Sequence, residues 1–348
     1  MNATIDDALE LLAESGPEFA FGAMRLSNHG PMAAEALIAL GREGAVVPWV
    51  ERYKRRLEDR PEARHPIAPD EWRGALGDIA RAGDWTVFFQ RELAGAPWRD
   101  ALDLWARRLA PGLIASATHG VIRTAHAARS MGAGETPLRL RELAEGLAYW
   151  AATYMLLPGA PSAASRGLRP AQALRAVETL PADQQRSFGT ITSHLRALDT
   201  LPSFAGAIDL VNVGADPSLF LSDLTETFAE VYLANAPNGN VIGLIHAVTG
   251  PSAVRLLAPH VSADTTALAL RYAWQAAAAL YATMAQQPAP ASIEVPGEDD
   301  QGLIDRAVST HDEHAIKFTE ACLREHALRP QPAYLAAARD ASERLRRG

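Results

Sequence analysis

The stretch GLIASATHGVIRTAHAAR, residues 112–129, carries the pattern that decides the fold. Its apolar residues recur at the spacing of an α-helix, and many of them are small. Alanine and leucine follow the same spacing along nearly the whole sequence, whereas alternating strand patterns are almost absent. The sequence therefore predicts an all-α protein, with one of its helices over 111–131.

The same spacing predicts the other helices. Pro31 lies near the first position of one helix that ends around Gly41. The remaining helices are predicted over 3–14, 45–60, 70–81, 84–94, 97–109, 138–155, 170–178, 183–199, 203–213, 216–236, 238–246, 250–259, 264–285, 300–326 and 330–346. Segments 158–169 and 288–299 are rich in Pro, Gly and Ser and predict loops. We expect one large helical domain over 1–348, with two lobes as a variant.

Composition narrows the class of protein. A hydrophobic content of 48% and a net charge of −8 are typical of a soluble globular protein and do not favour a nucleic-acid partner. The single cysteine, Cys322, excludes an intrachain disulfide and any cluster of thiolate metal ligands. Residues 1–16 lack the pattern of a signal peptide, and 241–259 and 265–285 are interrupted by polar residues or proline. We expect a cytoplasmic protein without a membrane partner.

Four of the ten histidines lie in surroundings that require an explanation. His246 lies in the apolar run NVIGLIHAV, where a buried imidazole must find a partner. His119 and His126 share one face of the predicted 111–131 helix, about 10 Å apart along its axis. Gly120 beside His119 leaves room for a close approach. His29 precedes a helix N-terminus, where a loop can direct a side chain inward.

The stretch THDEHAIKF, residues 310–318, contains one of only two lysines in a chain that otherwise uses arginine. On a helix over 300–326, His311 is at the centre of the apolar stripe, His314 is within it, and Lys317 is at its edge. His314 and Lys317 are three residues apart, so their side chains are neighbours.

These histidines fit two interpretations. Helical folds often build metal sites from inward-facing residues on different helices, and imidazole suits Zn, Cu, Fe and Ni. The other interpretation is that the histidines are hydrogen-bonded core residues and that the lysine keeps its amine in solvent. Spacing alone leaves both interpretations open.

Four segments together resemble the questin oxidase-like family of oxygenases, which acts on anthraquinones and related polyketide rings. They are SNHGPMAAEALIALG, PGLIASATHGVIRTAHA, IHAVTGPSAVRLLAPH and DEHAIKFTEACL, and they follow one another in consistent order. The resemblance implies an all-α fold and oxidative ring cleavage or Baeyer–Villiger-like oxidation. It also implies a non-haem iron centre bound by histidines and a carboxylated lysine.

Carried over position by position, the resemblance implies a set of metal ligands: His29, His119, His246, His314 and Lys317. His126 and His311 are then expected in the pocket or behind the ligands. The implied metal is Fe(II), with Zn or Mn as other metals for the same site. O₂ is the co-substrate, and NADPH is a further cofactor if the reaction needs a reductant.

The carbamate that the resemblance implies would explain why residue 317 is a lysine and not an arginine. A neutral lysine amine reacts with CO₂ to give a carboxylate-like ligand, whereas a guanidinium presents only hydrogen-bond donors. Ligating histidines also need acceptors for their second ring nitrogen. Asp312, Glu313 and Asn28 are the nearby residues that we consider for this role.

The leading hypothesis is an Fe(II)-dependent oxygenase acting on an apolar aromatic substrate of the polyketide type. Five aromatic residues are considered as stacking partners or as ordinary core: Trp85, Phe88, Phe89, Trp150 and Tyr154. A metal-free NADPH-dependent Baeyer–Villiger monooxygenase is a weaker hypothesis, because GAGETP at 132–137 is not a dinucleotide fingerprint. A Zn-dependent hydrolase or lyase is a third hypothesis, and a non-catalytic helical binding protein is a fourth.

Overall fold

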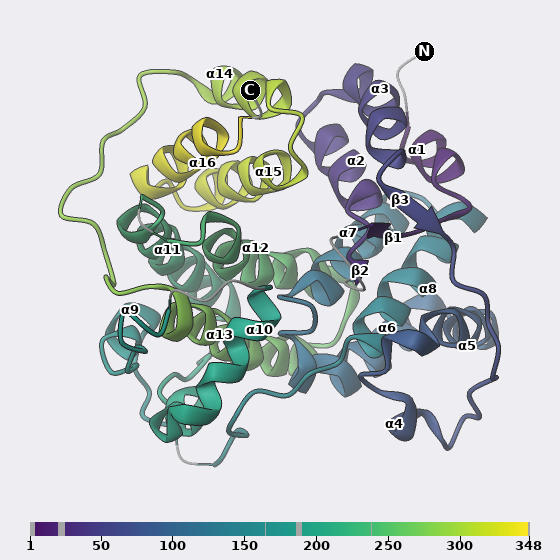
Figure 1. Cartoon of the computed structure of the whole chain (residues 1–348), viewed down its shortest axis with the longest axis horizontal. Coiled ribbons are helices and arrows are strands. Elements are labelled where there is room, and N and C mark those ends of the chain that lie inside the picture. Colours follow the sequence, from purple (N-terminus) through teal and green to yellow (C-terminus); the bar gives the residue numbers. More distant parts are fainter. Residues whose placement is uncertain (1–3, 20–24, 164, 186–189, 238, 347–348) are drawn as a thin grey trace. The chain divides into compact units, whose positions relative to one another are not determined.

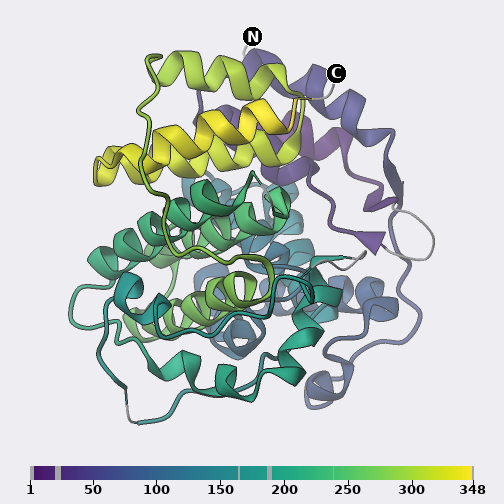
Figure 2. The same cartoon turned by 60° about the vertical axis from the view of Figure 1, so that its left-hand side comes forward.

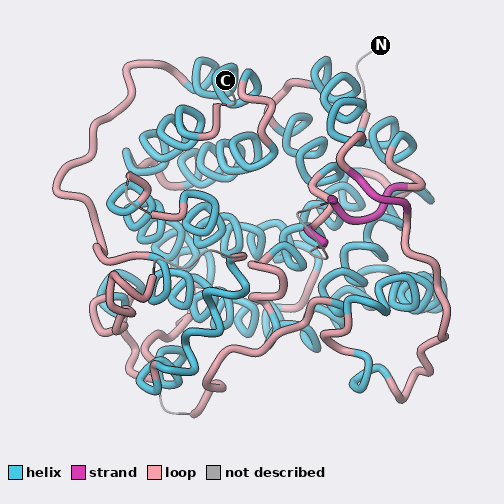
Figure 3. Tube along the Cα trace, in the orientation of Figure 1, coloured by secondary structure: helices cyan, strands magenta, loops and turns pink. Residues whose placement is uncertain are grey.

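The computed structural model describes residues 4–19, 25–163, 165–185, 190–237 and 239–346. Helices make up most of these residues and confirm the all-α fold (Figure 3). The chain divides into two compact units. The first unit comprises Met1–Met155 and Leu256–Thr265, and the second comprises Leu156–Arg255 and Thr266–Gly348.

The helices of the first unit come mostly from the N-terminal part of the chain (Figure 1). They are α1 (Ile5–Leu11), α2 (Gly30–Ala39), α3 (Glu43–Lys54), α4 (Trp72–Ala75), η1 (Ile79–Arg81), α5 (Ala82–Gly95), α6 (Trp98–Leu109), η2 (Ala110–Gly112), α7 (His119–Ala133), α8 (Pro137–Ala152) and η5 (Ala258–His260). Pro31 lies in the first turn of α2, as predicted. It fits there because the first backbone N–H groups of a helix have no partner within the helix.

Close packing joins α7 to α8 in the first unit. A Cβ added to Gly120 would lie 2.7 Å from the Cα of Trp150, and one added to Gly146 would lie 3.0 Å from the Cα of Thr124. Any other residue at either position would push the helices apart. Gly120 on α7 and Gly146 on α8 therefore set the distance between the two helices.

A small sheet adds strands to the first unit that the sequence did not predict (Figure 3). Its described strands are β1 (Ser15–Phe19), β2 (Arg25–Leu26) and β3 (Leu57–Asp59), in the order β2-β1-β3 with antiparallel pairing. The prediction of a helix over 45–60 is wrong at its end, because α3 stops at Lys54 and Leu57 pairs with Glu18. The central strand places Glu18 among buried residues.

The helices of the second unit follow in the C-terminal part of the chain. They are α9 (Pro170–Leu174), α10 (Ile191–Leu195), η3 (Arg196–Thr200), η4 (Pro202–Asp209), α11 (Pro217–Asn235), α12 (Val241–Leu257), α13 (Ala263–Met284), α14 (Asp300–Ser309), α15 (Glu313–Leu328) and α16 (Pro332–Arg344). Figure 2 shows α14, α15 and α16 packed side by side. The predicted loops 158–169 and 288–299 are confirmed among their described residues.

Several predicted helix boundaries are wrong. The helix predicted over 111–131 begins at His119, because the preceding residues form a turn with left-handed backbone. The segments predicted as separate helices over 238–246 and 250–259 form one helix, α12, which runs through Pro251. Burial of apolar residues on both sides of the proline outweighs its helix-breaking tendency there. Residue 238 and residues 186–189 of the predicted 183–199 helix lie outside the described residues.

The helix predicted over 300–326 is divided into α14 and α15. Asp312 caps the start of α15, because its Oδ1 accepts the backbone N–H groups of His314 and Ala315. His311 in the break has φ of 56° and is exposed. Its predicted place at the centre of an apolar stripe is therefore wrong.

Within the described residues, Val241–His260 is the one helical stretch long and apolar enough to cross a membrane. Its most apolar window is 78% buried inside the structure. Such burial is typical of a core helix in a soluble protein.

Candidate metal centre

The first unit brings His29 and His119 into direct contact. His29 occupies the N-cap position of α2, and His119 is the first residue of α7. Their Nε2 atoms are 2.8 Å apart, and the rings meet edge to face with centroids 4.7 Å apart. Both side chains are buried. Two residues separated by 90 positions in sequence thus form one histidine pair, which we call the first pair.

The other ring nitrogen of His29 faces acceptors from the sheet and from α3. Its Nδ1 lies 3.0 Å from Oε2 of Glu18 and 3.3 Å from the hydroxyl oxygen of Tyr53. The Tyr53 hydroxyl accepts the backbone N–H of His29 and donates to Glu18, which also forms an ion pair with Arg56. Because a carboxylate only accepts, His29 carries its proton on Nδ1 and presents Nε2 as an acceptor.

A left-handed turn fixes the other ring nitrogen of His119. The Nδ1 of His119 donates to the carbonyl oxygen of Ser116 at 2.5 Å. Ser116, Ala117 and Thr118 have φ values of 48°, 55° and 70°, a conformation that is unfavourable for residues with a side chain. The Ser116 hydroxyl is hydrogen-bonded to Tyr149 on α8 at 2.7 Å. His119 therefore also keeps its proton on Nδ1 and presents Nε2 as an acceptor.

The first pair thus places two acceptor nitrogens toward one another. Two lone pairs at this distance repel, so the arrangement needs a proton or a cation between them. Two nitrogens bound at right angles to one ion at about 2.1 Å lie about 3.0 Å apart, close to the observed separation. The donor set of the first pair therefore fits a metal ion.

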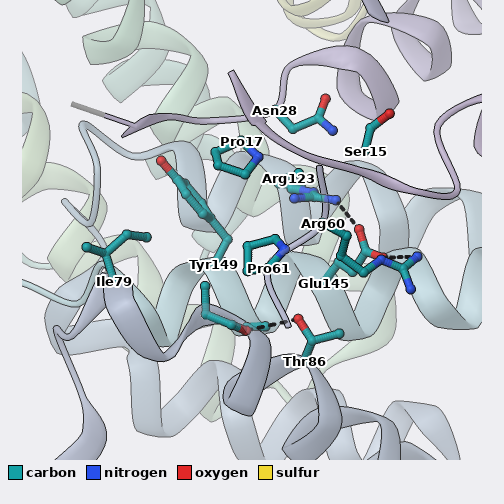
Figure 4. Close-up of a pocket in the computed structure, with 13 residues that line it drawn as sticks. Ser15, Pro17, Asn28, Arg60, Pro61, Ile79, Thr86, Arg123, Glu145 and Tyr149 are labelled. Atoms are coloured by element: carbon teal, nitrogen blue, oxygen red, sulfur yellow. Dashed lines mark hydrogen bonds and ion pairs between the residues drawn. The ribbon is translucent and has the colours of Figure 1, made fainter. Parts of the chain in front are cut away.

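A small pocket opens in the first unit (Figure 4). Asn28, next to His29 in the chain, and Tyr149, the partner of Ser116, both line it. Glu145 in its wall accepts hydrogen bonds from Arg123 and is ion-paired with Arg60. The cavity measures about 50 Å³, which admits water-sized molecules but not a polyketide ring.

The second unit contains a second pair, His246 and His314. His246 lies on α12 and donates from Nδ1 to the carbonyl oxygen of Ile242 at 2.6 Å, so its Nε2 is also an acceptor. The two rings meet edge to face with centroids 5.4 Å apart. Both residues are buried. This contact joins α12 to the first turn of α15.

Carboxylates surround His314 at the start of α15. Its Nδ1 is 3.6 Å from Oδ1 of Asp312 and 3.9 Å from Oε1 of Glu313, beyond hydrogen-bonding distance. Burial opposes ionisation of Asp312, but His314 and two backbone N–H groups outweigh it and lower the Asp312 pKa to about 2. Ligand atoms of Asp312, Glu313 and His314 lie within 4.8 Å of one another, so this group could hold a metal ion.

Lys317 follows one turn after His314 on α15, as the sequence predicts, and is 4% exposed. Lysine is rarely buried so completely unless its charge is balanced or removed. Its long stem thus lies inside the protein rather than carrying the amine to solvent. This burial suits a lysine with a chemical role.

The two histidines expected behind the ligands, His126 and His311, lie on α7 and just before α15. His126 is two turns beyond His119 on α7, and its Nδ1 lies 2.6 Å from Oε2 of Glu35 on α2. His311 lies in the break before α15 and is exposed. The role of either residue behind the ligands remains a prediction.

The partners of the first pair could not be predicted from the sequence. Asn28, expected as an acceptor for a histidine, instead accepts the backbone N–H of Gly30 through its Oδ1. Glu18 takes the expected role, together with Tyr53. A single buried glutamate on an unpredicted strand carries no signal, because nothing in the sequence links it to His29.

The aromatic residues considered for substrate stacking are largely core residues. Trp85, Phe88 and Phe89 pack with Trp105 at centroid distances of 4.9 to 6.3 Å. Trp150 is fully buried and donates from Nε1 to the carbonyl oxygen of Gly112. Core packing accounts for these contacts.

The helical fold contains buried histidines, three of which turn Nδ1 toward protein acceptors, and buried groups of histidine and carboxylate that could hold a metal ion. Comparison with protein families makes the assignment specific: the chain belongs to the questin oxidase-like family, whose model matches residues 26–322. A search of curated proteins gave no match. Membership of this family indicates an oxidoreductase, namely an oxidase that acts on polyketide substrates. The matched range contains both histidine pairs and Lys317.

Proposed function

We propose that the protein is an Fe(II)-dependent oxygenase that opens or expands the ring of an aromatic polyketide. The observation that supports it best is the proton arrangement of the histidines. Three of them, His29, His119 and His246, bind protein acceptors through Nδ1, which keeps Nε2 as the ligand atom. Histidines that bind metals almost always show such a partner at the second nitrogen.

The proposed ligands are the residues that family resemblance implies: His29, His119, His246, His314 and Lys317. The acceptors orient the imidazoles before any ion arrives. Lys317 would contribute an oxygen ligand as a carbamate. The neutral amine attacks CO₂, an N–C bond forms, and one proton leaves the nitrogen. Four neutral imidazoles and one carbamate anion leave one net positive charge on an Fe(II) centre.

When bound, Fe(II) would supply the activation of O₂ for reaction with an electron-rich ring. Ring cleavage with both oxygen atoms entering the product needs no further electrons. Insertion of one oxygen atom, as in a Baeyer–Villiger-like reaction, reduces the other to water and needs two electrons from a reductant such as NADPH. We propose an apolar aromatic substrate, because the family acts on polyketides.

We further propose a cytoplasmic location and no nucleic-acid partner. The net charge of −8 does not favour phosphate binding, and the single cysteine, Cys322, is buried and free. Neither feature bears on the chemistry of the site.

Metal reconstitution tests the proposed function. Purified protein is incubated with Fe(II) without oxygen, freed of excess metal and analysed for iron, zinc and manganese. We expect close to one equivalent of iron, and O₂ uptake when an anthraquinone is added. Less than about a tenth of an equivalent of any metal would reject the proposal. Full zinc occupancy without O₂ uptake would instead support a hydrolase or lyase.

A further inference from the structure

The two helices that carry the first pair are joined a second time, by ionised side chains further along. Glu35 on α2 accepts a hydrogen bond of 2.5 Å from Nε of Arg129 on α7, and it also forms an ion pair with one Nη of the same guanidinium. His126 on α7 approaches the same carboxylate at 2.6 Å. Burial opposes ionisation of Glu35, but His126 and Arg129 outweigh it and lower the Glu35 pKa. The first pair and this link both join α2 to α7.

The second pair shows the same plan on α12 and α15. Glu325 on α15 is fully buried. It accepts hydrogen bonds from Arg255 on α12, one from Nε at 3.0 Å and one from an Nη at 2.7 Å. Ser252 on α12 donates to Glu325 at 2.9 Å. Serine side chains on α11 accept further hydrogen bonds from Arg255.

The order of contacts along the helices is also the same in both units. Glu35 follows His29 by six residues, and its partner Arg129 follows His119 by ten. In the second unit both ion-pair partners likewise follow their histidines. Each histidine contact and its ion pair therefore lie at successive levels of two helices that run in the same direction. The links lie about 9 Å along α2 and about 16 Å along α15 from the histidines.

Buried ion pairs contribute little to stability, because removing two charges from water offsets most of their attraction. Their best-established use is to select one register, because a helix that slides leaves a buried charge without its partner. A metal site needs such control, since it depends on ligand positions within about 0.5 Å. Ion pairs on the same helices as the histidines are well placed to supply it.

We propose that Glu35 and Glu325 are positioning residues for the metal centre, each fixing the register of the two helices that carry one histidine pair. The inference rests on the proposed function, because it concerns the ion that the histidines bind. Neither carboxylate touches the ion or the substrate. Loss of either one lets its helix pair slide, which separates the ligand nitrogens and weakens metal binding.

The test for the first pair measures Co(II) binding to the full chain with Glu35→Gln. Co(II) alone serves as the probe, because its visible absorption reports coordination geometry as well as occupancy. We expect the Kd to rise about tenfold, the lower end of the range for residues that orient ligands, and the absorption bands to shift. Arg129→Lys, which keeps the charge but loses the paired geometry, gives a second variant if Glu35→Gln does not fold.

Asp84→Asn is the matched control in the first unit. Asp84 is a buried carboxylate that accepts two backbone N–H groups and Arg81, but it lies on α5, away from both histidine helices. Its loss should lower the melting temperature as Glu35→Gln does, while the Co(II) spectrum stays unchanged.

The same experiment applies to the second pair with Glu325→Gln, or with Arg255→Lys as the milder variant. Asp209→Asn is the control, because Asp209 pairs with Arg271 and neither lies on α12 or α15.

Three outcomes distinguish the positioning role of Glu35 and Glu325 from the proposed function itself. Weaker Co(II) binding and a shifted spectrum in the Glu35 and Glu325 variants, with unaltered controls, support the positioning role. Variants that bind within about twofold of the unmodified protein, or controls that weaken binding equally, overturn it. Failure of the unmodified protein to bind Co(II) or Fe(II) rejects the proposed function itself.

Discussion

The two histidine pairs differ in how firmly each is set before a metal binds. In the first pair, the Nε2 atoms are 2.8 Å apart, and both second nitrogens have close acceptors. In the second pair, the ring centroids are 5.4 Å apart, and Nδ1 of His314 is 3.6 Å from an oxygen of Asp312. The second pair also has Lys317 one turn away.

This difference indicates a division of roles under the proposed function. The first pair is organised by Glu18 and by a strained turn, so its nitrogens are fixed by the fold. The second pair contains His314, and the buried Lys317, for which we propose a carbamate, follows it by one helical turn. Under the proposed function, the first pair would supply fixed ligands, whereas the second pair and Lys317 would supply adjustable ones.

The largest expected effect comes from removing a ligand of the rigid pair. His119→Ala should reduce iron content to below about a tenth of an equivalent, because it removes a ligand and leaves His29 without its neighbour. His246→Ala should leave measurable iron. The measurement is metal analysis after anaerobic reconstitution, and His65→Ala, at an exposed position, is the control. A larger loss in His246→Ala would reverse the assigned roles.

Substitutions of Lys317 test the proposed carbamate ligand. Lys317→Ala should lower iron content, and a short carboxylic acid in the buffer should restore part of it by replacing the carbamate oxygen. Lys317→Arg should bind no better than the alanine variant, because a guanidinium cannot form a carbamate. Lys54→Arg, on the surface, is the control. Normal iron binding by Lys317→Arg would exclude the carbamate.

A smaller loss of metal affinity is expected when a carboxylate next to a ligand histidine is replaced. The size of this loss should differ between the two pairs. Glu18→Gln should weaken Co(II) binding about 10- to 100-fold, because the carboxylate no longer holds the proton on Nδ1 of His29. Asp312→Asn should have less effect, since its oxygen is 3.6 Å from Nδ1 of His314. Titration with Co(II) followed by absorption measures both. Equal effects would show that the two pairs are organised alike.

The contrast also explains which features could be predicted from the sequence. Helical spacing predicted the all-α fold, and Lys317 was correctly placed one turn after His314 because both lie within α15. The break at Asp312 was missed, since a side-chain cap competes with helix propagation only through hydrogen bonds that spacing does not show. Glu18 was missed because its role depends on a strand pairing distant residues.

The smallest expected effect concerns the stability of each unit at acid pH. It is measured on metal-free protein, so it separates folding from metal binding. Burial opposes ionisation of Asp84 in the first unit and of Asp209 in the second. Hydrogen bonds from His65 to Asp84 and from Ser162 to Asp209 help to outweigh burial, and both pKa values are lowered. A carboxyl with a lowered folded-state pKa stabilises the fold above its unfolded pKa of about 3.9, and this contribution is lost as the pH falls.

Asp84→Asn and Asp209→Asn should therefore lower the free energy of unfolding at pH 7 by about 1–3 kcal/mol and flatten its decline between about pH 5 and pH 2. Urea unfolding of the metal-free variants at several pH values measures this. Asp84 should have the larger effect, because it is more deeply buried than Asp209. An unchanged acid profile in Asp84→Asn would mean that this carboxylate does not stabilise the first unit.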